Sequence, residues 1–533
     1  MKNKLLLTTA IALLCFPTLM TAQAPVLGTA ANFALFSTNG AVSNTGLSNL
    51  TGNVGTNNGL STNFGNVDGQ MHDSDGVTAI AAADLTIAYN QLDAAIPTFF
   101  PAPLLGNGQI LNAGVYAIGE SASLSNAITL NGDANSIFIF QIEGAFSSSA
   151  GAQVLLTGGA LACNVFWKIE GLVNFASNTS FKGTIVANNA AIVTNTGVII
   201  EGRALSTTGA ITIAGSTVVM PLGCGSPVLT GPAEPVLASV ACYTIFSGNG
   251  EVTNTGISFV TGDVGTNVGL TTGFQAENVT GTIHANPDVS TAQCAADLNN
   301  VYTYLQTLPV DIELLYPAAA GNDLVLTPHT YLLDAATVIT GTLFLNAQDN
   351  PDAVFVLKIN GALSTGTYAK VELINSAQAK NVYWKIDGAI SLNDYADFKG
   401  TLIGNNGAMI LNTGVSLEGR ALSTNGGVST FGINAVMTPG CGELATVSNV
   451  ANANSVQFYP NPFHSTLNVK LGVAQMSGSQ LFIYNSVGVV LMNNILTDIT
   501  TSIPVGNLPT GVYFYKVIGA DGTVLSGKLI SKN

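Results

Sequence analysis

The strongest constraint on this chain is that one long stretch occurs twice. The segment from Cys163 to Cys224 returns, without a gap, from Lys380 to Cys441. Both copies contain N-V-[FY]-W-K-I-[ED]-G, F-K-G-T, N-T-G-V and E-G-R-A-L-S-T. Short apolar runs in each copy end at Gly, Asn, Ser or Thr, a rhythm typical of short strands separated by turns. The sequence therefore predicts a mainly β chain whose strands stack as the coils of two tandem solenoids.

Composition excludes several classes of protein. The 533 residues are 47% hydrophobic and only 8% charged, which excludes a disordered polar chain. The formal net charge of −15 argues against nucleic acid as a partner, because phosphate binding needs a basic surface. After the N-terminus no apolar run is long enough to span a membrane.

Residues 1–23 are predicted to form a secretory signal peptide. Lys2 and Lys4 precede an apolar run from Leu5 to Met20, and small residues follow it. The remaining chain divides into a first solenoid at 24–224, a three-proline linker at 225–236, a second solenoid at 237–442, a linker at 443–453 and a C-terminal domain at 454–533. The C-terminal domain alternates apolar and polar residues, which favours a small Ig-like β-sandwich.

Each copy also contains one predicted amphipathic helix, expected to lie along a wall of its solenoid. Ser74 or Asp75 and, in the second copy, Ser290 are the expected N-terminal caps, and Pro97 and Pro309 follow the helices. The predicted apolar stripes are Ile80, Ala83, Leu85, Ile87, Ala88 and Leu92 in the first helix and Ala295, Leu298, Val301, Tyr302 and Leu305 in the second.

Five cysteines remain after signal removal, so they cannot all pair within one chain. Cys242 and Cys294 occur only in the second copy, which favours a disulfide between them. Cys163 and Cys224 form a second candidate pair.

The two copies resemble the ice-binding protein family of the DUF3494 type. The matching residues are T-G-[ND]-V-G at 51–55 and 261–265, A-A-D-L at 82–85 and 295–298, N-V-[FY]-W-K-I, F-K-G-T and [EG]-G-R-A-L. The resemblance implies a right-handed, discontinuous β-solenoid with one flanking helix and a flat face that binds ice.

The C-terminal part resembles the type A sorting domain of the type IX secretion system. The matching residues are Y-P-N-P-F at 459–463, the strand Gly511–Val517 and the closing G-K-L-I-S-K-N. This resemblance implies the type IX secretion machinery as a partner. It also implies a protein that is secreted or attached to the cell surface.

Ice binding requires a flat, rigid face with few ions, because ionised groups hold their own hydration shells. Thr suits such a face, since it offers a methyl group and a hydroxyl on a stiff side chain. The stretch from Asn174 to Ile200 contains one charged residue, Lys182, and residues 204–219 contain none. The candidate ice-binding residues are Ser43, Thr45, Ser177, Thr179, Thr194, Thr196, Thr207, Thr208 and Thr212 in the first copy and Thr253, Thr255, Thr413, Thr424, Asn425 and Ser429 in the second. The alternative for each is a structural role in a solenoid turn or strand.

The two copies differ in charge. Asp394 and Asp397 stand where the first copy has Ser177 and Ser180. We therefore expect the first copy to bind ice more strongly, or the two copies to bind different planes.

Other chemistry has weaker support in the sequence. Glu201 with Arg203, and Glu418 with Arg420, are predicted to form local ion pairs, because residues i and i+2 of a strand share a face. One His precedes each helix without a clear second ligand, so no metal site is predicted. No cofactor motif is present.

These patterns favour a secreted, monomeric, non-enzymatic protein whose partner is the surface of an ice crystal. Two alternatives remain. An adhesin or carbohydrate-binding solenoid would be favoured by exposed aromatic platforms, and a polysaccharide-cleaving enzyme by an acidic cleft.

Overall fold

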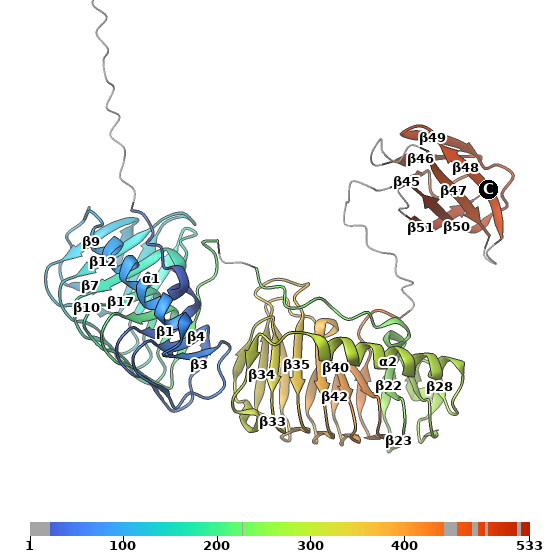
Figure 1. Ribbon diagram of the computed structural model, residues 1–533, viewed down its shortest axis with the longest axis horizontal. Coiled ribbons are helices and arrows are strands. Elements are labelled where there is room, and N and C mark those ends of the chain that lie inside the picture. Colours follow the sequence, from blue (N-terminus) through green and yellow to red (C-terminus); the bar gives the residue numbers. More distant parts are fainter. Residues whose placement is uncertain are drawn as a thin grey trace, which may run out of the picture. The chain divides into compact units, whose positions relative to one another are not determined.

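The computed structural model describes residues 22–225, 228–441, 456–471, 478–485, 489–519 and 524–532. The predicted signal peptide therefore lies almost wholly outside the described residues. The chain forms two compact units, Met1–Pro439 and Gly440–Asn533, and the first unit contains both repeat copies (Figure 1).

In each copy, one sheet of eight parallel strands contains no charged residue. We call it the uncharged sheet. In the first copy its order is β5 (Ser61–Thr62), β2 (Val42–Thr45), β20 (Ile211–Ala214), β18 (Ile192–Thr194), β16 (Val173–Phe175), β13 (Phe146–Ser148), β10 (Ala122–Ser125) and β7 (Leu104–Gly106). In the second copy it is β26 (Thr271–Thr272), β23 (Val252–Thr255), β43 (Val428–Phe431), β41 (Met409–Leu411), β39 (Ile390–Leu392), β36 (Leu363–Thr365), β33 (Thr337–Thr340) and β30 (Ala320–Gly321).

The larger sheet of each copy turns a corner and forms the other two faces of the coil. In β19 (Ile199–Ser206), residues 199–201 pair with β21 (Thr217–Val219), whereas residues 204–206 pair with β1 (Phe33–Ser37). β17 (Ser180–Ala187) bends in the same way, pairing with β14 (Gln153–Thr157) and then with β15 (Val165–Ile169). The first halves of these strands lie on what we call the charged face, and the second halves lie on the helix-covered face.

The remaining strands extend these two faces. In the first copy, the charged face also holds β3 (Asn49–Thr51), β11 (Ala127–Asn131) and β8 (Gln109–Asn112), and the helix-covered face holds β6 (Met71–Asp73), β4 (Asn53–Thr56), β12 (Phe138–Ile142) and β9 (Gly114–Ile118). In the second copy, β42 (Ser416–Ser423) and β40 (Asp397–Gly404) turn the corner between the two faces. Its charged face adds β27 (Val279–Thr280), β24 (Phe259–Thr261), β44 (Asn434–Val436), β37 (Lys370–Ile374), β34 (Thr342–Asn346) and β31 (Leu324–Leu326). Its helix-covered face adds β28 (Ile283–His284), β25 (Asp263–Thr266), β22 (Tyr243–Ser247), β38 (Val382–Ile386), β35 (Phe355–Ile359), β32 (Thr330–Leu333) and β29 (Ile312–Glu313).

The order of coils in space differs from their order along the chain. β1 pairs with β19 and β2 pairs with β20, so the N-terminal coil stacks on the last coil of its copy. The helix then carries the chain on to β7. Figure 1 shows the helices α1 (Gly76–Asp93) and α2 (Val289–Thr307) running along their solenoids. This arrangement confirms the predicted discontinuous, parallel solenoids with one helix each.

The helices differ from their predictions in detail. Of the two predicted caps of α1, Asp75 is the observed one, and it forms a capping box with Thr78. The cap of α2 is Asp288, not the predicted Ser290. Ile80, Ala83 and Ile87 belong to the predicted apolar stripe, yet all three are exposed. Smaller side chains fill the contact instead, because the helix lies close over Phe36 and Phe166 of the sheet. The buried residues of α1 are Thr78, Ala81, Ala82, Leu85, Ala88 and Leu92.

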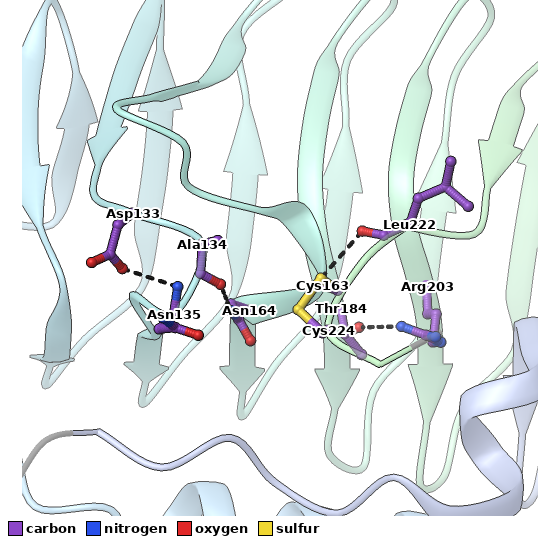
Figure 2. Close-up of a disulfide and its surroundings, with 9 residues drawn as sticks. All are labelled: Asp133, Ala134, Asn135, Cys163, Asn164, Thr184, Arg203, Leu222 and Cys224. Atoms are coloured by element: carbon purple, nitrogen blue, oxygen red, sulfur yellow. Dashed lines mark hydrogen bonds between the residues drawn. A yellow bond between two sulfur atoms is a disulfide. The ribbon is translucent and has the colours of Figure 1, made fainter. Parts of the chain in front are cut away.

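The cysteines confirm one prediction and correct the other. Cys163 and Cys224 form a disulfide with an S–S distance of 2.06 Å (Figure 2). Cys294 is a free thiol on the buried side of α2, so the predicted Cys242–Cys294 bond is wrong. Cys242 and Cys441 are instead both disulfide-bonded. Burial among apolar side chains raises the pKa of the Cys294 thiol, which keeps it in its unreactive form.

The two copies also touch through a buried polar contact. Asp68 of the first copy is 3% exposed and accepts hydrogen bonds from the hydroxyls of Tyr331 and Thr327 in the second copy. Nearby, the amide of Gln70 donates to Asp311 O at 2.7 Å. A buried carboxylate is tolerated when its oxygens have donors, so this contact joins the copies at a defined place.

The C-terminal unit contains two antiparallel sheets. One has the order β45 (Val456–Tyr459), β46 (Thr466–Leu471), β49 (Thr500–Pro504), and the other β48 (Val490–Leu496), β47 (Ser479–Tyr484), β50 (Gly511–Ile518), β51 (Val524–Ser531). Leu467 and Ile503 of the first sheet share a core with Leu481 and Val517 of the second, as in a β-sandwich. Within the described residues, no helix has the length and apolar character that crossing a bilayer requires.

Candidate functional site

Each uncharged sheet presents one continuous row of outward side chains, with one residue from each of the eight strands in the first copy and from seven of the eight in the second. Neighbouring residues of a strand point to opposite sides, so the central residue of each strand faces outward while its neighbours fill the core. In the first copy the row is Thr62, Ser43, Thr212, Val193, Asn174, Ser147, Ser123 and Leu104. In the second it is Thr272, Thr253, Ser429, Ile410, Ser391, Ser364 and Val338.

One cross-strand hydrogen bond orders a pair of hydroxyls in each row. Ser43 Oγ donates to Thr212 Oγ1 at 3.3 Å, and Thr253 Oγ1 donates to Ser429 Oγ at 3.0 Å. These pairs occupy the same place in the two copies. The β-branched threonine of each pair has few χ1 rotamers, so these paired hydroxyls and the threonine methyl groups are held at defined positions.

A second outward row lies beside the first and differs between the copies. In the first copy Thr45 stands next to Ala214, and both side chains are small. In the second copy the equivalent Thr255 stands next to Phe431, whose side chain is 38% exposed. A large ring therefore stands up from the second uncharged sheet where the first is level.

Other candidate residues lie at the two edges of the uncharged sheets. Thr207, Thr208, Thr424 and Asn425 are at the edge nearest the helix, and Ser177, Thr196 and Thr413 are at the opposite edge. Asn425 belongs to an amide ladder: Asn249 donates to it at 2.9 Å, and it donates to Asn406 at 3.0 Å. These seven side chains are partly or fully exposed, and their role stays a prediction.

Two predicted ice contacts are wrong. The Thr179 and Thr194 side chains are 0% and 1% exposed, so neither can contact a surface outside the protein. Thr194 lies two residues after Ile192 and shares its inward direction, where its hydroxyl bonds Ser216 Oγ at 2.7 Å. The Thr179 hydroxyl bonds Ser148 Oγ and a backbone carbonyl at the corner of the coil. Both satisfy buried polar groups.

The neighbouring charged face has a different chemistry. Lys182 and Glu201 pair at 2.6 Å in the first copy, and Lys399 pairs with Asp397 and Glu418 in the second. The predicted Glu201–Arg203 pair is absent from the described contacts, because the corner of β19 at Gly202 puts the two residues on different faces. The same corner separates Glu418 from Arg420. Ion pairs also lie on the helix-covered face, where Lys168 and Lys385 each have acidic partners. The uncharged sheet, in contrast, has no titratable side chain.

An exposed aromatic pair marks the far edge of the second uncharged sheet. Tyr368 and Tyr395 stack with their ring centroids 5.0 Å apart and are 65% and 50% exposed. Both have positive φ angles, 59° and 58°, which are unusual for bulky residues. The first copy has Gly151 and Asn178 at these places. Asp394 lies beside Tyr395, so this edge carries rings and a charge that the first copy lacks.

Several residues of the outward rows are not among the predicted candidates, including Thr62, Ser123 and Ser147 in the first copy and Ser364 and Ser391 in the second. The local alternation of apolar and polar residues indicates these positions. In V-S-N at 42–44, I-T-I at 211–213, V-N-F at 173–175 and A-S-L at 122–124, a residue stands between two buried ones. That alternation identifies the outward position, whereas a search for Thr alone does not.

The two histidines that precede the helices act at the helix N-termini. His72 Nδ1 lies 2.6 Å from Asp75, and His284 Nδ1 lies 2.7 Å from Asp288, the two capping residues. Across the described ranges, no group of three or more His, Cys, Asp or Glu side chains is placed to hold a metal ion.

Comparisons with known proteins agree with this architecture. A family model described as ice-binding-like matches residues 36–219 and 246–436, and one described as a secretion system C-terminal sorting domain matches residues 457–532. An ice-binding protein from Nostoc sp. (strain HG1) is 37% identical over 198 residues, covering 36% of this chain and 72% of that protein. One from Colwellia sp is 34% identical over 215 residues, covering 37% and 83%.

A solved structure extends the likeness over both copies. The crystal structure of an ice-binding protein from an Antarctic bacterium of the Flavobacteriaceae is 71% identical to this chain. The match covers 79% of this chain and 100% of that one, with a TM-score of 0.78. Since either copy alone is less than half of the chain, this match requires two solenoids in the relative as well.

Proposed function

The chain belongs to the ice-binding-like family, and from that membership we propose that it is a secreted protein that adsorbs to ice through its two uncharged sheets. The observation that carries the proposal is the ion-free outward row on each sheet. Coils of a parallel ladder repeat every ~4.7–4.9 Å, so each row sets hydroxyls and methyl groups at a constant spacing near the oxygen repeats of ice. Adsorption of this kind would pin a growing ice front, giving thermal hysteresis and inhibition of recrystallisation.

The same sheets supply the rigidity that the proposal needs. The core behind the first row is closely packed, with Phe140 and Trp167 stacked at 3.9 Å between centroids. Because the strands pack on this core, the Ser and Thr side chains of the outward row can bind ordered water without a change in backbone conformation. Charged residues, which hold their own hydration shells, lie on the other two faces of each solenoid.

The C-terminal sorting domain places the protein outside the cell. It is the part that engages the type IX secretion machinery, and the product is extracellular. We further propose that the mature protein acts as a monomer without enzymatic activity, because its two uncharged sheets require no second chain. The predicted boundaries at 24–224, 225–236, 237–442, 443–453 and 454–533 are retained as proposals.

Paired substitutions test the proposed surface. Thr212→Tyr with Ser429→Tyr puts one ring on each outward row, at equivalent places in the two copies. We expect most of the thermal hysteresis to be lost, measured by nanolitre osmometry, with an unchanged circular dichroism spectrum. The matched control is Thr217→Tyr with Asn434→Tyr on the charged faces, which should keep its activity. Equal activity in both double variants would remove the uncharged sheets from the proposal.

One observation favours a second candidate function, carbohydrate binding. The exposed Tyr368–Tyr395 pair is the kind of aromatic platform on which sugar rings stack. Glycan-array binding that is lost in Tyr368→Ala, together with absent ice shaping, would favour this function over ice adsorption.

A further inference from the structure

Arg203 and Arg420 occupy equivalent places in the two copies, but their guanidinium groups differ in hydrogen bonding. In each copy Nε donates to a short 3-10 helix that precedes the first strand. Arg203 donates to Ala31 O at 2.8 Å, and Arg420 donates to Ala241 O at 3.2 Å. The local fold therefore holds both side chains in the same way at their base.

At the tip the two arginines diverge. Arg420 also donates to the hydroxyl of Thr438 at 2.5 Å and to its carbonyl at 2.9 Å. The first copy has Pro221 in place of Thr438, so that hydroxyl is missing. The other contact of Arg203 is a longer bond to Thr184 Oγ1, at 3.3 Å. Of the five N–H donors of the Arg203 guanidinium, two have acceptors among the described residues.

Arg203 is also buried without an acidic partner. Its side chain is 7% exposed, and among the described residues no carboxylate lies within ion-pair distance of it. Desolvation lowers the pKa of Arg203 to about 10, so the group is still charged at neutral pH. A buried charge without a counter-charge is strongly destabilising, and such a group is often explained by a bound ion.

The free side of the guanidinium faces a cavity of about 1080 Å³. This volume is at the upper end of the range for small-molecule sites, roughly 300–1,000 Å³. Figure 2 shows Arg203 beside the Cys163–Cys224 disulfide, with Asn164 on the other side of it. The cavity is lined in part by Arg203, the disulfide, Asn32 and Asn164 from the first copy and by Asp311 and His329 from the second.

The carboxylates in the cavity wall are engaged elsewhere. Asp68 accepts from Tyr331 and Thr327, and Asp311 accepts the backbone N–H of Thr330 at 2.9 Å. Neither neutralises Arg203. The two acidic groups in the wall repel a doubly charged phosphate more strongly than a singly charged carboxylate, and neither of them forms an ion pair with Arg203.

We propose that this cavity binds a small carboxylate, of the sugar-acid class, on the free N–H groups of Arg203. A guanidinium presents two parallel N–H donors that match the two oxygens of a carboxylate. The amide of Asn32 offers a further donor and acceptor for ring hydroxyls, whereas that of Asn164 already donates to Ala134 O at 2.8 Å. Because both copies contribute to the wall, an occupant would contact the two solenoids at once.

Isothermal titration calorimetry of the full secreted chain with sodium glucuronate tests the site. We expect saturable binding of one equivalent, no binding of glucose, and at least a tenfold weaker affinity in Arg203→Gln. Pro221→Thr is a second, milder variant, since it restores the hydroxyl that satisfies Arg420 in the other copy. It should also weaken glucuronate binding while the melting temperature is kept or raised.

Three results would overturn the proposal: no saturable heat with glucuronate, an equal affinity for glucose, or an unchanged affinity in both variants. Arg203 lies away from the uncharged sheets. Thermal hysteresis without glucuronate should therefore be the same in the wild type and both variants, which separates this site from the proposed contact with ice.

Discussion

At the scale of single residues, the direction of a side chain decides whether a threonine belongs to a surface or to the core. Thr212 and Thr194 lie on adjacent strands of the same sheet, β20 and β18, yet Thr212 faces outward and Thr194 faces inward. Their chemistry is identical and their roles are opposite. A candidate contact must therefore be judged by its register in the ladder.

Thr194→Val tests this distinction. The change keeps the shape of the side chain but removes the buried hydroxyl that bonds Ser216. We expect a loss of about 1–2 kcal/mol in stability, seen as a lower melting temperature in differential scanning calorimetry. Thermal hysteresis at low temperature should be unchanged. A clear fall in hysteresis, with stability retained, would place Thr194 in the ice contact after all.

At the scale of the secondary-structure element, the two uncharged sheets differ in flatness. The second sheet carries Phe431 in its second row, and the stacked Tyr368 and Tyr395 stand at its edge. A flat ice surface cannot make close contact with a sheet from which aromatic rings protrude. This difference supports our expectation that the first copy binds ice more strongly.

Phe431→Ala measures the effect of the ring. The test is made in a Thr212→Tyr background, where the first sheet is blocked and the second provides the remaining activity. We expect thermal hysteresis to rise relative to Thr212→Tyr alone, because Ala matches Ala214 of the first copy. The control is Phe259→Ala, an exposed aromatic residue on the charged face. An equal response to both changes would mean that Phe431 does not limit binding.

At the scale of the whole molecule, the contact between the copies depends on a buried acid. Burial raises the pKa of Asp68 above its ordinary value, and the positive charge of His329 opposes that rise. A raised folded-state pKa means that the folded protein holds the proton more tightly than the unfolded chain does. The stability from Asp68 is therefore fully present below its unfolded pKa and is lost as the pH rises through the folded pKa.

Asp68→Asn removes this titration, while its amide can still accept from Tyr331. We measure melting temperatures of both proteins from acidic to neutral pH. As the pH rises, the melting temperature of the wild type should fall further below that of Asp68→Asn. Parallel curves for the two proteins would show that Asp68 does not titrate in this range.

Local sequence patterns are enough to predict the two repeats, the stacked short strands, the single helix per copy and the sandwich-forming alternation at the C-terminus. These features depend on local periods and turn residues, which can be read without knowing what lies nearby. Tertiary structure alone decided the rest. The corner at Gly202 separates Glu201 from Arg203, and the closing of each coil turns Thr179 and Thr194 inward. The bonding of Cys242, with Cys294 left free, and the contact between the copies likewise depend on residues far apart in the chain. Such pairings are set by how complete coils close and stack, so short-range sequence patterns do not specify them.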